Sequence, residues 1–327
     1  MITLEHLTNL SSAVPWGLWV SIYVWLIGIS LAAYAVMMTG QAFKVEEVKG
    51  GVALKVVCIS IATLLVGLLS ILIDLGHIER FRLLFTSFSP TSVMSWMVML
   101  YNLFLVVLVI TFLLLAKKKR IPSTFCGLTA VFALGLIILE SFLFAGPPGK
   151  LWHSPVFLLH FLATALLSGS AAILCFTSVA GPKKEAPKEQ FIFRTTLTLL
   201  VISLILELAE LLHLKGFNQV NGIYLIGAYI VGLGLLLVPH PVTRIASSFV
   251  IIFNVLASKY NSIVSAQTVE PFKEFSRAFM DQKLTYGYRP NSLEWTASFV
   301  LMLLAVILSI LLYLFYKLVF APRKKEA

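Results

Sequence analysis

The chain has 327 residues, of which 59% are hydrophobic and only 12% are charged, and its mean hydropathy is +0.95. Soluble domains carry about 25% charged residues, so this composition excludes a soluble globular protein and indicates a polytopic membrane protein. The net charge of +10 does not indicate a nucleic-acid-binding protein, because the basic residues crowd into loops between apolar segments.

Nine apolar segments are long enough, or nearly so, to cross about 30 Å of hydrocarbon. They lie at about 16–40, 52–75, 94–116, 122–145, 153–180, 192–213, 222–238, 243–258 and 295–320. Pro239 and Pro241 separate the seventh segment from the eighth, because proline disfavours a continuous helix. The sequence therefore predicts an all-α fold in which residues 1–327 form a single integral membrane domain.

The three cysteines, Cys58, Cys126 and Cys175, lie singly within these apolar segments. No two of them have the spacing of a metal-binding motif, so we expect no iron–sulfur cluster, zinc site or disulfide framework in this chain. Residues 1–14 show no basic region before an apolar one, and we therefore expect no cleaved signal peptide.

Lysine and arginine are distributed unevenly between the two sides of the predicted bundle. If the N-terminus is outside, most of the 25 basic residues fall on the inner side, including Lys117–Arg120 and Lys183–Lys184. Because positive charge accumulates in cytoplasmic loops, the N-terminus is predicted outside and the C-terminus inside. The long polar segment 259–294 then lies outside as an extracytoplasmic loop, and we expect it to dock a partner.

Ionisable residues within the predicted helices gather near the outer face of the membrane. They are Asp74, Glu140, His160, Glu207, Glu210 and His213, and Glu294 opens the last segment. A carboxylate in hydrocarbon costs several kcal/mol unless it is paired, hydrated or protonated. Their confinement to one depth therefore indicates a polar cavity that opens outward and handles protons, and the i,i+3 spacing places Glu207 and Glu210 on one side of their helix.

Structural explanations stay open for several of these residues. Asp74 could form an interfacial salt bridge with Arg80 or Arg82. The tryptophans most simply belong to an aromatic belt, and Gly28, Gly67 and Gly169 to close helix packing.

A b-type haem needs two facing histidines, and His160 with His213 is the one pair at matching depth.

Five motifs occur in the same order as in one known family. They are Pro15-Trp-Gly-Leu-Trp19, Leu72-Ile-Asp-Leu-Gly-His-Ile-Glu-Arg-Phe81, Ser92-Val-Met-Ser-Trp96, Leu151-Trp-His-Ser-Pro155 with Leu167-Ser-Gly169, and Tyr288-Arg-Pro-Asn-Ser-Leu-Glu294. The chain thereby resembles the NrfD/polysulfide-reductase membrane subunits, especially their hydrogenase-linked branch. In the second motif, His77-Ile78 stands where Arg-Pro is commoner in the family.

The resemblance implies a membrane subunit of a respiratory complex, built around two four-helix bundles and carrying no haem or iron–sulfur cluster of its own. Such a subunit binds a quinone, either menaquinone or ubiquinone, near the outer face of a bacterial inner membrane. The implied partner is a periplasmic ferredoxin-like iron–sulfur subunit. That partner serves a catalytic subunit, which is a molybdopterin oxidoreductase, a hydrogenase or a multihaem cytochrome.

Together, the depth of the charges and the resemblance predict a site that exchanges protons with a quinone. The expected proton-handling residues are Asp74, His77, Glu140, Glu207 and Glu210. The expected quinone-binding residues are Asp74, His77, Arg80, Trp16, Tyr23, Trp96 and His160. The alternatives are an ion-coupled secondary transporter built on Glu207 and Glu210, or a haem b quinol-oxidising subunit.

Overall fold

Every predicted apolar segment is a helix in the computed structural model, which describes residues 17–74, 88–145, 155–179, 190–213, 222–265 and 290–320. The helices are α2 (Leu18–Ala42), α3 (Gly51–Asp74), α5 (Val93–Ala116), α6 (Ser123–Ala145), α7 (Pro155–Val179), α8 (Phe191–His213), α9 (Gly222–Leu237), α10 (Pro241–Tyr260) and α13 (Ser292–Val319). The described residues contain no β-strand, so the prediction of an all-α membrane protein is confirmed. All of these helices except the 16-residue α9 are long and apolar enough to cross a membrane.

Local sequence signals set several of the helix ends. In α13, Asn291 Oδ1 accepts from the backbone N–H of Glu294, and Glu294 Oε2 accepts from the backbone N–H of Asn291, both at 2.8 Å. This reciprocal capping satisfies backbone donors that a helix start leaves without partners. Pro241 opens α10 at a position where its missing N–H removes no hydrogen bond.

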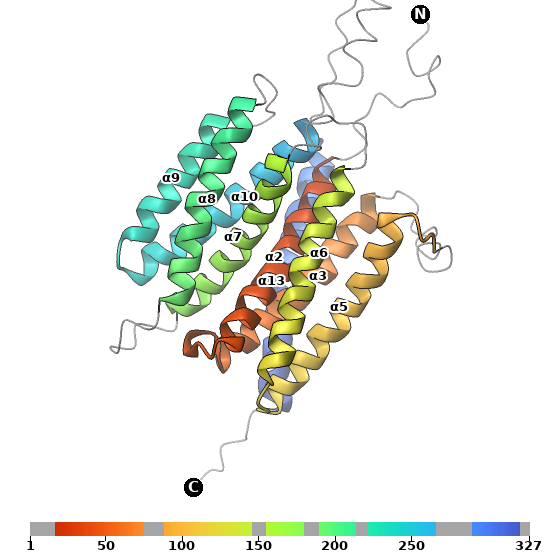
Figure 1. The fold of residues 1–327 in the computed structure, drawn as a ribbon, viewed down its shortest axis with the longest axis vertical. Coiled ribbons are helices and arrows are strands. Elements are labelled where there is room, and N and C mark those ends of the chain that lie inside the picture. The colour runs from red at the N-terminus through yellow and green to blue at the C-terminus, as the bar shows by residue number, and fades with distance from the viewer. Residues whose placement is uncertain are drawn as a thin grey trace, which may run out of the picture.

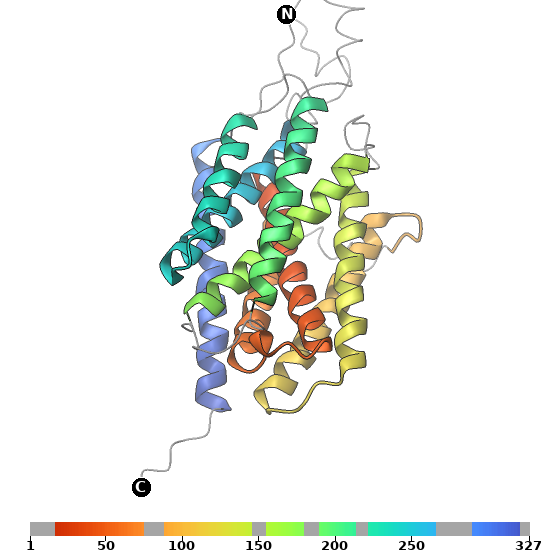
Figure 2. The same cartoon turned by 60° about the vertical axis from the view of Figure 1, so that its left-hand side comes forward.

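The helices form two four-helix bundles that share one long interface (Figures 1 and 2). In the first bundle, α2, α3, α5 and α6 pack in a closed ring. In the second bundle, α7, α8, α9 and α10 do the same, and α13 packs along the outside against α3. The centre of the molecule is α2, which also contacts α7 and α10. The expected pair of four-helix bundles is thus confirmed.

A glycine permits the close approach of α2 to α7 at the interface between the bundles. A Cβ atom added at Gly169 would lie 2.3 Å from the backbone nitrogen of Ala33 and 2.6 Å from the carbonyl carbon of Ala32. Nearby, Trp25 of α2 donates its indole N–H to the carbonyl of Ile252 in α10 at 2.9 Å. The predicted packing role of Gly169 is confirmed, and backbone contact fixes the two bundles against each other.

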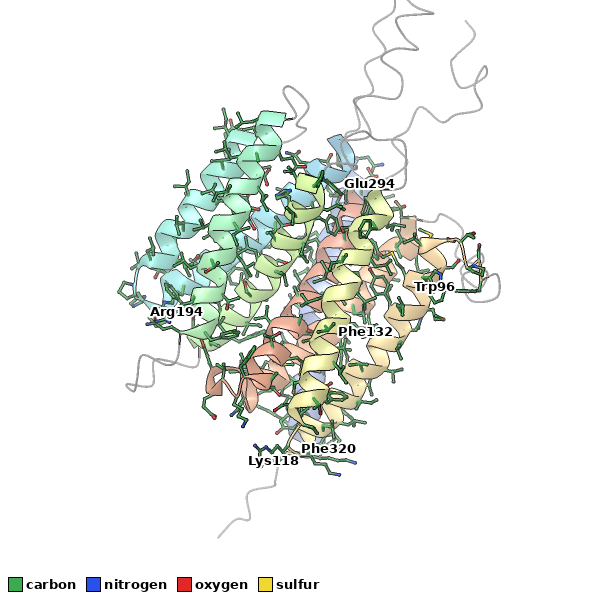
Figure 3. The ribbon with its side chains drawn as sticks, viewed as in Figure 1. Trp96, Lys118, Phe132, Arg194, Glu294 and Phe320 are labelled. Atoms are coloured by element: carbon green, nitrogen blue, oxygen red, sulfur yellow. The ribbon has the colours of Figure 1, made fainter. Side chains whose placement is uncertain are left out.

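The two ends of the molecule differ in charge. Within the described residues, every lysine and arginine except Lys259 lies at or near one end, which we call the basic end. These residues are Lys44, Lys49, Lys55, Lys117, Lys118, Lys119, Arg120, Arg194, Arg244 and Lys317. In Figure 3, Lys118 and Arg194 lie at this end and Glu294 lies at the opposite end.

Candidate functional site

Ionisable side chains from both bundles meet in the interior, about two helical turns from the end opposite the basic end. Glu140 of α6 is 0% exposed, His160 of α7 and Lys259 of α10 are each 2% exposed, and Glu207 of α8 is 6% exposed. With Tyr23, Tyr101, Glu210 and Ser258 they form what we call the polar cluster. The structure therefore brings together four of the residues that were predicted from their depth.

His160 bridges two carboxylates of α8. Its Nε2 atom lies 3.0 Å from Glu207 Oε2, and its Nδ1 atom lies 2.5 Å from Glu210 Oε2. The i,i+3 spacing aims both carboxylates at the one ring. Both ring nitrogens can donate only when the imidazole is protonated, so this arrangement stores a proton that three groups share. It leaves neither nitrogen of His160 free to ligate a haem iron.

The end of α10 completes this side of the polar cluster. Ser258 Oγ donates to Glu207 Oε2 at 2.7 Å and lies 3.4 Å from His160 Nε2. The ammonium of Lys259 donates to the carbonyl of Phe161 at 2.8 Å and lies 3.2 Å from the centre of the Phe161 ring. A cation over an aromatic face is stabilised by the ring quadrupole. Lys259 is also close enough to interact electrostatically with Glu140, Glu207 and Glu210.

Glu140 links this group to two tyrosines of the first bundle. The Tyr101 hydroxyl lies close enough to Glu140 to interact with it, and the Tyr23 hydroxyl donates to that of Tyr101 at 3.4 Å. Among the described residues, however, neither carboxylate oxygen of Glu140 has a partner with hydrogen-bond geometry. A buried carboxylate without such a partner is costly unless it holds a proton or meets a ligand. Glu140 is therefore the member of the cluster that can hold a proton or contact a ligand.

Asp74 lies in a second polar group nearer the surface. It is half-buried at the end of α3, where it and Tyr260 are close enough to interact electrostatically with Glu294 of α13. Within the described residues, Asp74 shares no hydrogen bond or ion pair with the polar cluster. The structure thus divides the predicted site into an inner group of glutamates and histidine and an outer group around Asp74.

The remaining predicted site residues lie at the surface or outside the described residues. Trp96 is 40% exposed, its indole N–H donates to the carbonyl of Pro90 at 2.9 Å, and its ring packs edge-on against Phe88. This placement agrees with a position in an aromatic belt. Trp16, His77, Arg80 and the side chain of His213 are outside the described residues.

Lys259 and Ser258 were not predicted as site residues. The eighth apolar segment was expected to end at residue 258 and the polar segment 259–294 to begin there, whereas α10 runs to Tyr260 and continues as the π-helical turn η4 (Asn261–Ser265). The apolar pair Ile263 and Val264, which is buried just beyond the polar residues, is the signal that could have indicated a longer helix. Residues 266–289 lie outside the described part, so a docking role for this segment stays a prediction.

Comparisons with known proteins agree with the resemblance found in the motifs. Residues 6–258 match the family described as "Polysulphide reductase, NrfD". The chain is 25% identical to a subunit of the selenate reductase of Mesobacillus selenatarsenatis, over 92% of this chain and 85% of that protein. It is 27% identical to the Hdr-like menaquinol oxidoreductase integral membrane subunit of Archaeoglobus fulgidus, over 52% of this chain and 44% of that protein. The matched family region contains every member of the polar cluster except Lys259.

Proposed function

The chain belongs to the NrfD family of polysulphide reductase membrane proteins, and we propose that it is the quinone-binding membrane subunit of a respiratory oxidoreductase complex. In this proposal it exchanges electrons between the quinone pool and a periplasmic iron–sulfur partner, which serves a catalytic subunit. The observation that carries the proposal is the polar cluster buried between the two bundles. The names of the two relatives, a selenate reductase subunit and a menaquinol oxidoreductase subunit, support it.

The residues of the polar cluster fit a quinone head group. A quinone, when bound, supplies two carbonyl oxygens that take up two protons along with two electrons. A site for it needs an apolar surrounding and a few groups that donate hydrogen bonds and exchange protons. The Glu140 carboxylate, which lacks a hydrogen-bond partner among the described residues, and the Tyr101 hydroxyl are such groups. We assign the binding of the head group to Tyr101 and Glu140, with the Tyr23 hydroxyl donating to that of Tyr101.

The remaining members of the cluster hold and compensate charge. His160, Glu207 and Glu210 share a proton through two short contacts. Lys259 supplies a positive charge among the three carboxylates of the cluster, which lowers the cost of keeping any of them ionised in the interior. Asp74 lies nearer the surface. Together with His77 and Arg80, which follow it in the sequence, it is assigned to proton exchange with the outer solution.

Proton exchange is proposed on one face of the membrane only. Within the described α-helices, Asp and Glu occur in the half that contains the polar cluster, and none occurs in the half toward the basic end. No chain of carboxylates in these helices therefore crosses the bilayer, and we do not propose a proton pump. The described helices also run unbroken through the middle of the bundle, whereas secondary transporters use broken helices at the bilayer midplane.

The test is quinol-dependent electron transfer in membranes that contain the whole complex. Glu140→Gln keeps the shape of the side chain but removes its proton-exchanging group, so turnover is expected to fall by about 100-fold or more while the complex assembles. Glu46→Gln is the matched control, because Glu46 is an exposed carboxylate at the basic end, paired with Lys49. Unchanged turnover in an assembled Glu140→Gln complex would contradict the assignment.

A further inference from the structure

A groove opens between the two bundles at the basic end, far from the polar cluster. It has a volume of about 750 Å³ and is lined by α2, α6, α7 and α8. Its walls are formed by apolar side chains, and its rim carries polar ones. The wall residues include Val36, Leu134, Leu166 and Leu199, and Gln190 and Arg194 stand at the rim.

The packing of the helices explains why the groove exists. In the first bundle α6 packs against α2, and in the second bundle α8 packs against α7, so the groove follows the boundary between the bundles. Near the basic end the groove is lined by Phe191. Its ring packs so tightly against α2 that a Cβ atom at Gly40 would lie 3.2 Å from it. The groove therefore has apolar walls along the bundles and extends to residues at the basic end.

The guanidinium of Arg194 supplies positive charge at this end of the groove. Arg194 is exposed and forms no ion pair within the described part of the chain. The nearby Glu47 carboxylate instead accepts the backbone N–H of Ile192 at 3.1 Å, in the first turn of α8. An anion is the missing partner for the Arg194 guanidinium.

We propose that this groove binds one anionic phospholipid, with an acyl chain along the apolar walls and the phosphate on Arg194. A guanidinium matches the geometry of phosphate oxygens and forms charge-assisted hydrogen bonds to them. Basic pockets at the ends of membrane helices recognise anionic lipid head groups on these grounds. A quinone, the ligand proposed for the polar cluster, carries no charge for Arg194 to pair with. Because the groove touches both bundles, the bound lipid would also stabilise their junction.

The test measures which lipids the full-length chain keeps after transfer from nanodiscs that contain equal amounts of phosphatidylglycerol and phosphatidylcholine. Native mass spectrometry should show preferential retention of phosphatidylglycerol by the unaltered chain. Arg194→Gln should lower that retention about fivefold, the contribution of one basic residue near an anionic surface. Arg120→Gln removes the same charge from the same end outside the groove, and retention should not change.

A second pair of variants tests the groove independently of charge. Thr198→Phe places a ring in the groove from an exposed position on α8, and it should displace the retained phosphatidylglycerol. Ile205→Phe places the same ring on the exposed face of the same helix outside the groove, and retention should persist. Equal retention of both lipids by the unaltered chain, or full retention after Arg194→Gln or Thr198→Phe, would overturn the proposal. Loss of bound quinone from the Thr198→Phe variant would also overturn it, because the groove would then hold the quinone.

Discussion

Lys259 governs the charge balance of the polar cluster, because it is the one lysine or arginine among the described residues that lies beside Glu140, Glu207 and Glu210. Its ammonium is held by the Phe161 carbonyl and ring, and the glutamates lie within electrostatic reach. Burying charges is costly, and removing one partner from a compensated group leaves the others unpaired. The cost of losing Lys259 therefore depends on how many carboxylates remain.

We accordingly expect Lys259→Met to lower the free energy of unfolding by about 3–5 kcal/mol, the usual effect of breaking a buried charge pair. Adding Glu140→Gln should restore part of this loss, because it removes one of the uncompensated carboxylates. Thermal unfolding of the purified chain in detergent measures both, with Lys119→Met in the exposed turn after α5 as the control. Strictly additive effects in this double-mutant cycle would show that Lys259 does not compensate Glu140.

The contacts between His160 and the α8 carboxylates predict that these residues act as one unit. His160→Gln and Glu210→Gln should each reduce quinol-dependent turnover of the complex strongly, and the double variant should lose little more than either single one. Groups that share one proton lose their joint function when any member is removed. His240→Gln, at the exposed start of α10, is the control histidine substitution. Losses that multiply in the double variant would argue for separate roles.

The acidic half of this site was predictable from the sequence, and its basic half was not. Glu140, Glu207 and Glu210 stand out because carboxylates within apolar segments demand an explanation. Lys259 does not stand out, because it follows Ser258 and begins a run of polar residues that is typical of a loop. Its burial depends on Phe161, 98 positions away along the chain. Local hydropathy carries no information on such a contact.

At the scale of the helices, the helix boundaries were predictable from the sequence. Which helices pack against each other was not. Each predicted span ends within a few residues of the observed helix, since hydropathy and capping residues act locally. The arrangement in two bundles was predicted only by the resemblance to the NrfD family. The central place of α2 follows from small residues such as Ala32, Ala33 and Gly169, which let its backbone approach α7.

Gly169→Ala is expected to destabilise the chain by about 1–3 kcal/mol or more, because the added methyl group would collide with the backbone of α2. Gly135→Ala is the matched control, since a Cβ atom on that α6 glycine meets nothing within 4 Å. That change should be neutral or slightly stabilising, as alanine favours helix over glycine. Thermal unfolding in detergent compares the two variants. Equal melting temperatures would mean that α2 and α7 can separate at no cost.

At the scale of the whole molecule, charge distinguishes the two ends. The basic end gathers nearly all described lysines and arginines, while the polar cluster and Asp74 lie toward the other end. The positive-inside rule predicts that the basic end faces the cytoplasm and that the polar cluster lies beneath the outer face. The side on which the proposed iron–sulfur partner docks depends on this orientation.

Labelling of single cysteines in intact cells tests the orientation. In a chain whose Cys58, Cys126 and Cys175 are replaced by alanine, Thr91→Cys places a thiol in the exposed turn before α5, and Lys118→Cys places one in the turn after it. A membrane-impermeant maleimide should label Thr91→Cys in intact cells and Lys118→Cys only after permeabilisation. The two turns bound the same helix, so each variant is the control for the other. The reverse pattern would place the polar cluster near the cytoplasmic face, and the proposed partner with it.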